Sequence, residues 1–181
     1  MPVTYVALLR GVNVGGKNVL PMAALAQIFS DAGSTDVVTF IQSGNVVFSA
    51  SATVARGLAD RVATAIVERF GFGSVVILRS AREFEDAIAS NPFLGTVTDL
   101  RQLHVMFLAR KPEPDRVATL DAGRSPGDSF VASDREIYLS LPNGTAGSKL
   151  TNAYFDAKLA TTSTVRNWNT VLKLAELLRR A

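Results

Sequence analysis

The chain of 181 residues has no cysteine and only one histidine, His104. The lack of cysteine excludes disulfides, thiolate nucleophiles and sulfur-ligated metals, and a single histidine excludes a multi-histidine metal site. We therefore expect no metal site. Acidic residues are missing from the glycine- and asparagine-rich loops described below, so paired-carboxylate catalysis has little support.

Long apolar segments are missing as well. No apolar run approaches the roughly 18 residues that cross a bilayer, and the first five residues lack the basic and apolar regions of a signal peptide. We expect a cytoplasmic protein without a membrane partner. Hydrophobic residues make up 48% of the chain and charged residues 19%, which is typical of a folded globular protein.

The net charge of +3 is unevenly distributed along the chain. Residues 149–181 contain six basic residues and two acidic ones, so the positive charge belongs to the C-terminal segment. This asymmetry is compatible with an acidic or phosphorylated partner, although mild basicity more often reflects ordinary solvation of a basic surface.

Hydrophobic periodicity and turn residues predict an α+β fold. The first half is expected to contain, in order, a strand (3–9), a helix from Pro21 to Gly33, strands 36–41 and 45–49, a helix (53–70), a strand (74–79) and a short helix (80–90). The second half follows a looser version of the same order, with a strand (102–109), a helix (114–122), strands 128–132 and 136–141, and helices from about 148 and 164. We expect two ferredoxin-like subdomains of βαββα type with antiparallel sheets, 1–95 and 96–181, packed as one compact body.

The loop at 10–18 nearly matches a phosphate-binding loop, because four residues separate Gly11 from Gly16-Lys17. Asn18 stands where such a loop has the serine or threonine that ligates magnesium, and Pro21 delays the helix beyond Lys17. Nucleotide hydrolysis is therefore not expected. Exposed backbone amides beside Arg10 and Lys17 still favour anion binding, whereas the alternative is that the glycines only shape a turn.

Three further segments are rich in polar residues. Residues 42–45 (Gln-Ser-Gly-Asn) form a turn whose residues are ordinary turn residues. A second glycine loop (141–149) also joins a strand to a helix, with Ser148 as the expected N-cap. Arg166, Asn167 and Asn169 are expected in the first turn of the last helix, where a cation opposes the helix dipole unless an anion lies near.

Two other side chains are expected to be structural. His104 shares a strand face with Met106 and Leu108 and has no nucleophile tied to it in sequence, while Trp168 falls on the apolar face of its helix. Readout of single-stranded RNA on the sheet is not expected, because the third strand lacks the aromatic residues that would stack on bases.

Several of these segments resemble the bacterial family known as domain of unknown function 1697. The resemblance is carried by residues 5–18, 41–48, 148–150 and 166–170, and it covers nearly the whole chain. It implies a two-subdomain α+β fold of ferredoxin-like character and no particular activity. Relatives often have arginine before the serine at 148, where this chain has Gly147, which weakens the case for an anion contact there.

The leading hypothesis from the sequence is a binding module for a phosphorylated small molecule or a nucleic-acid backbone. Its cations and amides would come from the polar loops; the candidate ligand-binding residues are Arg10, Asn13, Lys17, Asn18, Ser43, Asn45, Ser148, Lys149, Arg166 and Asn169. The alternatives are an enzyme acting on a small anionic substrate, with Lys17 or Ser43 as nucleophile or proton carrier, and a structural or oligomerising protein. The sequence indicates no particular cofactor, catalytic residue or oligomeric state.

Overall fold

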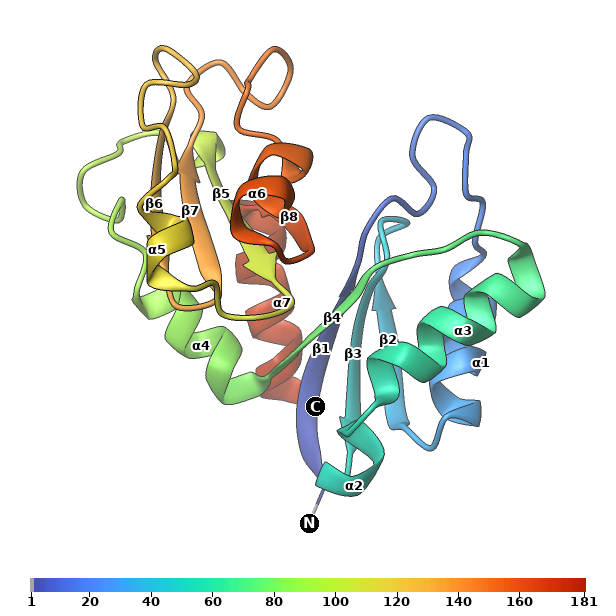
Figure 1. Ribbon diagram of the computed structural model, residues 1–181. Coiled ribbons are helices and arrows are strands. Elements are labelled where there is room, and N and C mark those ends of the chain that lie inside the picture. The colour runs from blue at the N-terminus through green and yellow to red at the C-terminus, as the bar shows by residue number, and fades with distance from the viewer. Residues whose placement is uncertain (1) are drawn as a thin grey trace. The chain divides into compact units, whose positions relative to one another are not determined.

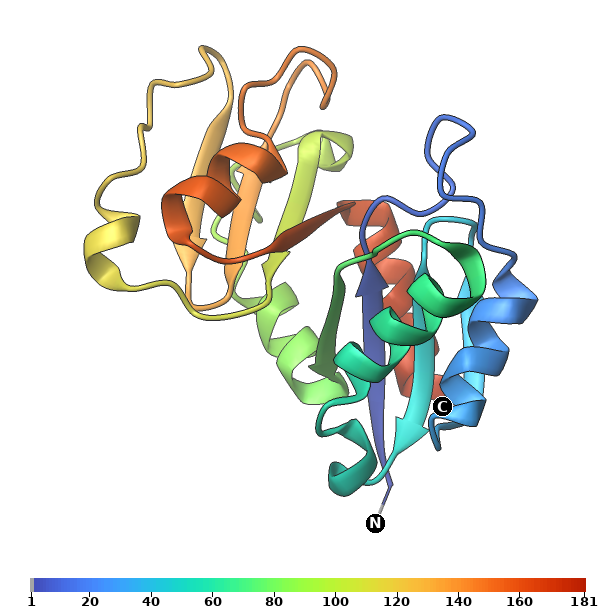
Figure 2. The ribbon, with the colours of Figure 1, turned by 45° about the vertical axis from the view of Figure 1, so that its right-hand side comes forward.

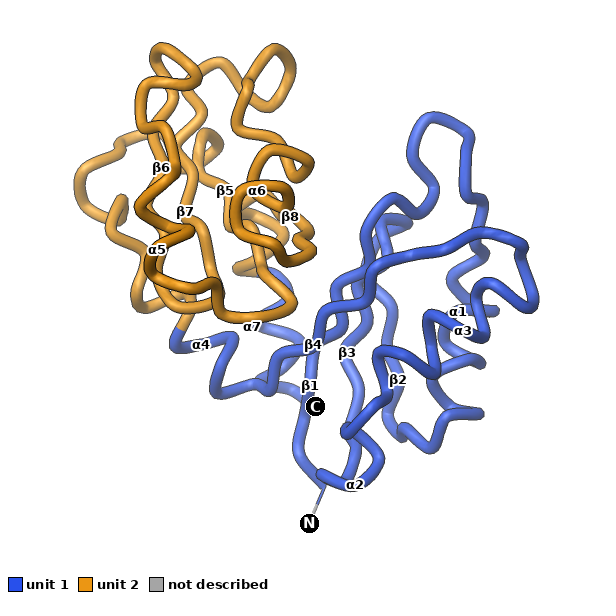
Figure 3. Tube along the Cα trace, in the orientation of Figure 1, with its two compact units in different colours: residues 1–86, 173–181 blue, residues 87–172 orange. Residues whose placement is uncertain are grey.

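The computed structural model describes residues 2–181, which form an α+β protein with two four-stranded antiparallel sheets and seven α-helices. The chain divides into two compact units, coloured separately in Figure 3. Unit 1 consists of the residues up to Asp86 together with Lys173–Ala181, and unit 2 consists of Ala87–Leu172. No helix within the described range is long and apolar enough to cross a membrane.

The sheet of unit 1 has the order β2-β3-β1-β4, with every neighbouring pair antiparallel. Its strands are β1 (Val3–Leu9), β2 (Thr35–Phe40), β3 (Asn45–Ala50) and β4 (Val76–Ser80). Two helices, α1 (Met22–Asp31) and α3 (Leu58–Phe70), cover one face of this sheet, as Figures 1 and 2 show. The strands and the first helix lie within a few residues of the positions predicted from the sequence.

Aromatic rings fill the core between this sheet and its helices. The Phe48 ring stacks on Tyr5, with centroids 5.6 Å apart, and lies 5.1 Å from the ring of Phe29 in α1. Phe48 and Phe29 are fully buried. All six residues of β3 are buried, and Phe48 places one large ring between this strand and α1, at the centre of the apolar layer.

The predicted continuous helix over residues 53–70 is wrong, because the structure has two helices there. Helix α2 (Ala52–Ala55) ends at Arg56, whose ψ of 118° is extended, and Gly57 follows in the left-handed conformation. The Arg61 guanidinium donates to the carbonyl oxygens of Val54 and Arg56, which satisfies the end of α2. Glycine tolerates this backbone better than any other residue, so the break occurs there.

Unit 2 repeats the strand order of unit 1, as β6-β7-β5-β8. Its strands are β5 (Leu103–Leu108), β6 (Ser129–Ser133), β7 (Glu136–Ser140) and β8 (Ser163–Asn167). Two helices, α5 (Pro114–Val117) and α6 (Asn152–Leu159), lie on one face of this sheet. The elements not yet named are α4 (Ala81–Ala89), the 3-10 helix η1 (Leu100–Gln102) and α7 (Trp168–Arg180).

The prediction that the last helix begins at Thr164 is wrong, since residues 163–167 form strand β8. This strand pairs with β5 from Leu108 opposite Ser163 to His104 opposite Asn167. Its β-branched residues suit a strand, and pairing them satisfies their backbone groups. Helix α7 begins only at Trp168, with the Asn167 side-chain oxygen accepting from the Thr170 N–H at 2.8 Å in the manner of an N-cap.

The helix predicted over 114–122 is also too long, because α5 ends at Val117. The Tyr154 hydroxyl of α6 accepts a hydrogen bond from the Asp121 N–H at 2.8 Å, which draws the chain out of helical geometry. The helical cover of the second sheet is consequently much shorter than that of the first.

Because the strands of both sheets pair in the same order, the pairing of individual residues shows which positions of unit 1 and unit 2 are equivalent. In unit 1 Val6 pairs with Arg79 and with Val47, and in unit 2 Val105 pairs with Arg166 and with Tyr138. The equivalent arginines Arg79 and Arg166 are both buried on the fourth strand of their sheet.

Candidate functional site

The loop between β1 and α1 forms a small hairpin, residues 13–18, which we call the finger. Val14 and Lys17 pair as an antiparallel bridge, and the Lys17 N–H donates to the Val14 carbonyl at 3.0 Å. Gly15 and Gly16 between them have φ values of 58° and 73°, as a two-residue hairpin turn requires. Figures 1 and 2 show this loop projecting beyond the ends of the strands of unit 1.

Asn13 fixes the base of the finger. Its Nδ2 donates to the carbonyl oxygens of Leu20 at 2.9 Å and Gln42 at 2.8 Å, and its Oδ1 accepts from the Leu20 N–H at 2.8 Å. Because Gln42 belongs to the turn between β2 and β3, these bonds join the two loops. Asn13 has a φ of 54°, a conformation that asparagine tolerates better than most residues.

The other side of the finger is held in a similar way. Asn18 donates from Nδ2 to the Gly11 carbonyl at 2.8 Å, and the Ser74 hydroxyl donates to the Arg10 carbonyl at 2.9 Å. The Arg10 N–H in turn donates to the Val75 carbonyl at 3.0 Å. The finger therefore stands on a base whose polar groups are bonded to the strand ends around it.

The turn at 41–44 packs directly against this base. A Cβ added at Gly44 would lie 2.7 Å from both Leu9 Cβ and Val12 Cγ2, and the φ of Gly44 is 75°. Asn45 is fully buried and donates from Nδ2 to the Phe40 carbonyl at 3.1 Å and to Ser43 Oγ at 2.9 Å. The amides of Asn13, Asn18 and Asn45 thus all take part in bonds that build the loops.

The exposed surface around the finger combines positive charge with apolar side chains. Lys17 is exposed and makes no ion pair among the described residues, and no acidic residue occurs within 2–30 or 37–59. Val14, Val19 and Ile41 are 63%, 64% and 51% exposed, the highest values among the large hydrophobic residues that remain exposed. Exposed apolar side chains of this size are available for contacts with a partner.

In unit 2, Ser148 is part of a loop network and does not cap a helix. Its hydroxyl donates to Asp128 Oδ2 at 2.7 Å, and the hydroxyl of buried Ser125 donates to the same oxygen at 2.6 Å. The Lys149 N–H donates to Ser125 Oγ at 3.1 Å. The N-cap of α6 is instead Thr151, whose hydroxyl oxygen accepts from the Tyr154 N–H, so the predicted N-cap at 148 is wrong.

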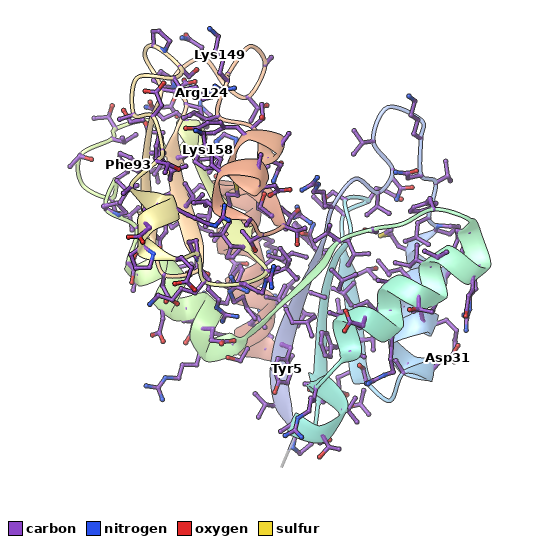
Figure 4. The ribbon with its side chains drawn as sticks, viewed as in Figure 1. Tyr5, Asp31, Phe93, Arg124, Lys149 and Lys158 are labelled. Atoms are coloured by element: carbon purple, nitrogen blue, oxygen red, sulfur yellow. The ribbon has the colours of Figure 1, made fainter. Side chains whose placement is uncertain are left out.

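Lys149 and Arg124 lie at the same end of unit 2, where Figure 4 labels both side chains. The Arg124 Nε donates to the Lys149 carbonyl at 3.0 Å, and the guanidinium lies 4.1 Å above the centre of the Tyr154 ring. This contact is a cation–π interaction, which holds Arg124 flat against α6. The Lys149 side chain is exposed.

Arg166 lies inside a strand and is buried, which differs from the helical first turn expected for it. Its Nη1 donates to Thr164 Oγ1 and to the Val165 carbonyl, both at 2.8 Å. Burial lowers the pKa of the guanidinium to about 10, so Arg166 remains charged at neutral pH. Asn169 is exposed in the first turn of α7.

The structure therefore groups the predicted residues by unit. Arg10, Asn13, Lys17, Asn18, Ser43 and Asn45 come together around the finger and its neighbouring turn, whereas Ser148 and Lys149 share the loop before α6, and Arg166 and Asn169 follow in β8 and α7. Within residues 2–181, no three histidine or acidic residues are placed to hold a metal ion.

The sequence matches a known protein family over most of its length. The family model described as "Protein of unknown function (DUF1697)" matches residues 3–138, about three quarters of the chain. The chain belongs to this family. No match is found among curated proteins.

A solved structure has the same fold as this DUF1697 protein. The conserved bacterial protein SP0830 from Streptococcus pneumoniae superimposes with a TM-score of 0.76, over 98% of this chain and 99% of that one, at 23% sequence identity. At that identity the likeness establishes the fold alone.

Sequence reasoning missed three residues of this DUF1697 protein that shape the loops. Ser125 and Asp128 bracket Pro126-Gly127, the signature of a type II turn, so the pattern for that turn was present. Nothing in the sequence indicated that Ser148 would share Asp128 with Ser125, since this contact joins residues 20 positions apart. The third residue, Arg124, packs on a ring that only the fold brings near it.

Proposed function

We propose that the protein binds the phosphate backbone of a nucleic acid through the finger. The observation that carries this proposal is that the finger presents exposed Lys17 on a base fixed by Asn13, in a stretch of chain without acidic residues. A positive charge held in place by a rigid loop loses little conformational entropy when it meets a phosphate.

The charge distribution along the sequence supports the proposal. Arg10 and Lys17 are the only charged residues in positions 2–30, so no carboxylate within this segment competes with a phosphate for Lys17. Two other exposed cations of unit 1 do have acidic partners, in the pairs Arg69–Asp31 and Arg82–Asp86. Lys17 differs from these cations because an external anion would be its first partner.

The shape of the finger favours a polyanion over a small phosphorylated molecule. A Cβ added at Gly15 or Gly16 would meet no atom within 4 Å, so the tip is surrounded by solvent. Small-molecule sites are concave and bury most of their ligand, whereas contacts to a phosphate backbone need only exposed cations. Exposed Val14 and Val19 would add apolar contacts to sugars or base edges in a groove.

Two further proposals concern the topology of each unit and the location of the protein. We propose that each unit is ferredoxin-like, since both sheets have the order fourth-first-third-second in their own strand numbering and both place two helices on one face. We also propose a cytoplasmic location, where nucleic acids are accessible.

Fluorescence anisotropy with labelled single- and double-stranded DNA and RNA tests the proposal. We expect binding that weakens steeply between about 50 and 200 mM salt. Lys17→Ala should weaken binding roughly fivefold to tenfold near 0.1 M salt and reduce the slope of log affinity against log salt by about 1. Lys158→Ala is the matched control, because Lys158 is an exposed lysine outside the finger.

Two results would contradict the proposal. One is binding to none of these nucleic acids at low salt; the other is equal loss of affinity in Lys17→Ala and Lys158→Ala, which would indicate a nonspecific charge effect. A thermal-shift series with nucleotides and sugar phosphates tests the alternative hypothesis, a site for a small phosphorylated molecule. A ligand at about 100 times its dissociation constant stabilises a protein by about 2.7 kcal/mol. Stabilisation by a small phosphate compound at high salt would favour a discrete small-molecule site instead.

A further inference from the structure

Unit 2 contains a cavity of about 160 Å³ between its sheet and the start of α6. The cavity is walled by the sheet on one side and by the loop before α6 on the other. Its lining combines apolar and neutral polar side chains: Met106, Leu139, Leu141, Leu150, Val165, Thr145, Ser148, Thr151 and Asn152. None of these residues carries a charge.

The equivalent place in unit 1 is filled by aromatic rings. Tyr5 pairs with Phe48 in unit 1, and His104 pairs with Leu139 in unit 2, so Leu139 occupies the position of Phe48. The Phe48 ring lies between Tyr5 and Phe29, within 5.6 Å of each ring centre. Unit 2 thus has a leucine where unit 1 has the central ring of its core.

Two other differences enlarge the space in unit 2. Val165 occupies the position of Leu78 and is one methylene smaller; Leu78 pairs with Ala7 and Val165 with Met106, the residues that follow the equivalent valines Val6 and Val105. Helix α1 has ten residues and contributes Phe29, whereas its counterpart α5 has four residues and no aromatic side chain. These three changes leave more room beside the sheet of unit 2, while Met106, which lines the cavity, is larger than its counterpart Ala7.

The polar groups at the cavity leave hydrogen-bonding capacity unused. Ser148 is committed to Asp128 and to the Leu150 N–H. Asn152 donates from Nδ2 to Ser163 Oγ, while its Oδ1 has no partner in the part of the chain that the structure describes. The Thr145 hydroxyl likewise lacks a partner there, and Thr151 uses its oxygen only to accept from the Tyr154 N–H. Both a donor and an acceptor are therefore available to a ligand.

We propose that this cavity binds a small neutral aromatic molecule that has one hydrogen-bonding group, with phenol as the simplest example. A dry protein cavity of about 150 Å³ accommodates benzene, and the Phe48 ring in unit 1 demonstrates that this place in the fold suits an aromatic ring. Burying a phosphate among neutral side chains would leave its charge unpaired, so the ligand class differs from that proposed for the finger. The two proposals are independent.

Two-dimensional ¹H–¹⁵N NMR of the intact protein with phenol, benzene and inorganic phosphate tests this assignment. Phenol should shift the amide signals of the cavity residues, saturating with a dissociation constant on the order of 1 mM. Benzene should shift the same signals more weakly, and phosphate should leave them unchanged. Shifts that are scattered over the protein or never saturate would overturn the assignment, because they indicate nonspecific contact.

Variants that copy unit 1 provide the sharper test. Leu139→Phe places in the cavity a ring equivalent to that of Phe48, and it should weaken phenol binding at least about tenfold. Val165→Leu adds one methylene to the cavity wall and should weaken phenol binding several-fold. Val131→Phe is the control, since Val131 is exposed on β6 and does not line the cavity. If Leu139→Phe fails to fold, the conservative Val165→Leu still decides the matter.

Removing one hydroxyl tests the polar part of the proposal. Thr145→Val replaces an exposed hydroxyl by a methyl group of similar size. It should weaken phenol binding about threefold to tenfold and leave benzene binding unchanged. Phenol affinity that survives both Leu139→Phe and Val165→Leu would overturn the assignment of the cavity.

Discussion

The Asn13 side-chain amide donates to the Gln42 carbonyl oxygen at 2.8 Å and so joins the loop after β1 to the turn between β2 and β3. Asn13 also bonds twice to Leu20, at the point where the chain enters α1. One side chain therefore connects three segments and sets the direction in which the finger projects.

Asn13→Ala should destabilise the protein by about 2 kcal/mol. The substitution leaves the Leu20 N–H without its acceptor and places alanine at a φ of 54°, each of which costs on the order of 1 kcal/mol. Urea unfolding measures the change. Gln42→Ala serves as the control, because Asn13 contacts only the main chain of Gln42, and its effect should stay within about 0.5 kcal/mol.

Gly44→Ala should destabilise the protein by more than about 3 kcal/mol, since the new Cβ would meet Leu9 Cβ and Val12 Cγ2 at 2.7 Å in addition to the unfavourable φ. Gly15→Ala has a similar positive φ but open space around its Cβ, so only the backbone cost of about 1 kcal/mol is expected. The comparison by denaturant unfolding separates steric overlap from backbone strain, and equal losses in the two variants would contradict this account.

Tyr138→Phe should cost about 1 to 2 kcal/mol in unfolding free energy. The buried Tyr138 hydroxyl donates to the Ala87 carbonyl at 2.7 Å, and phenylalanine would leave that oxygen without this donor. Burial also raises the pKa of Tyr138, so its hydroxyl stays protonated at pH values where an exposed tyrosine would ionise. Tyr5→Phe is the control, because Tyr5 contributes its ring to the Phe48 stack, and a loss as large in this variant would argue against the hydrogen bond at Tyr138.

Stability should fall as the pH drops below about 6.5, in part because of His104. Burial lowers the pKa of His104 below 6.5, partly offset by its contact with the Gln102 carbonyl. The unfolded chain therefore takes up a proton before the folded chain does, and stability is lost as the pH falls through the folded pKa. His104→Gln should flatten the dependence of the unfolding midpoint on pH between about 7 and 5.

Asp31 provides the contrast in that experiment. The hydrogen bond from Arg69, followed by that from Gln27, lowers the pKa of the Asp31 carboxyl below 3.8. Its contribution is present above that value and is lost at lower pH. Asp31→Asn should therefore leave the slope between pH 7 and 5 unchanged, and a flattening equal to that of His104→Gln would contradict the assignment.

Local patterns predicted most of the strands, and they failed where distant contacts decide the structure. The run from Val3 to Leu9 is apolar and uninterrupted, and it forms β1 as expected. By contrast, the strand character of residues 163–167 depends on pairing with β5, about sixty residues earlier, although the β-branched Thr164 and Val165 were a local signal for it. A helix was favoured there because the following residues have helical spacing.

The loops illustrate the same limit. Glycine positions correctly indicated tight turns at 15–16 and at 44. The sequence did not reveal that the asparagine amides would be used within the protein, since the partners of Asn13 include Gln42, 29 positions away. Which polar side chains remain available for a ligand depends on tertiary contacts, and in the finger that residue is Lys17.

The division of the chain into units has a consequence for its synthesis on the ribosome. Unit 1 includes Lys173–Ala181, which are translated after all of unit 2. Domains generally fold as units while the chain emerges. Unit 1 therefore cannot be completed until Lys173–Ala181 have been made, whereas all residues of unit 2 are made earlier. A nascent chain stalled before residue 173 would carry an unfinished N-terminal half exposed to chaperones and proteases.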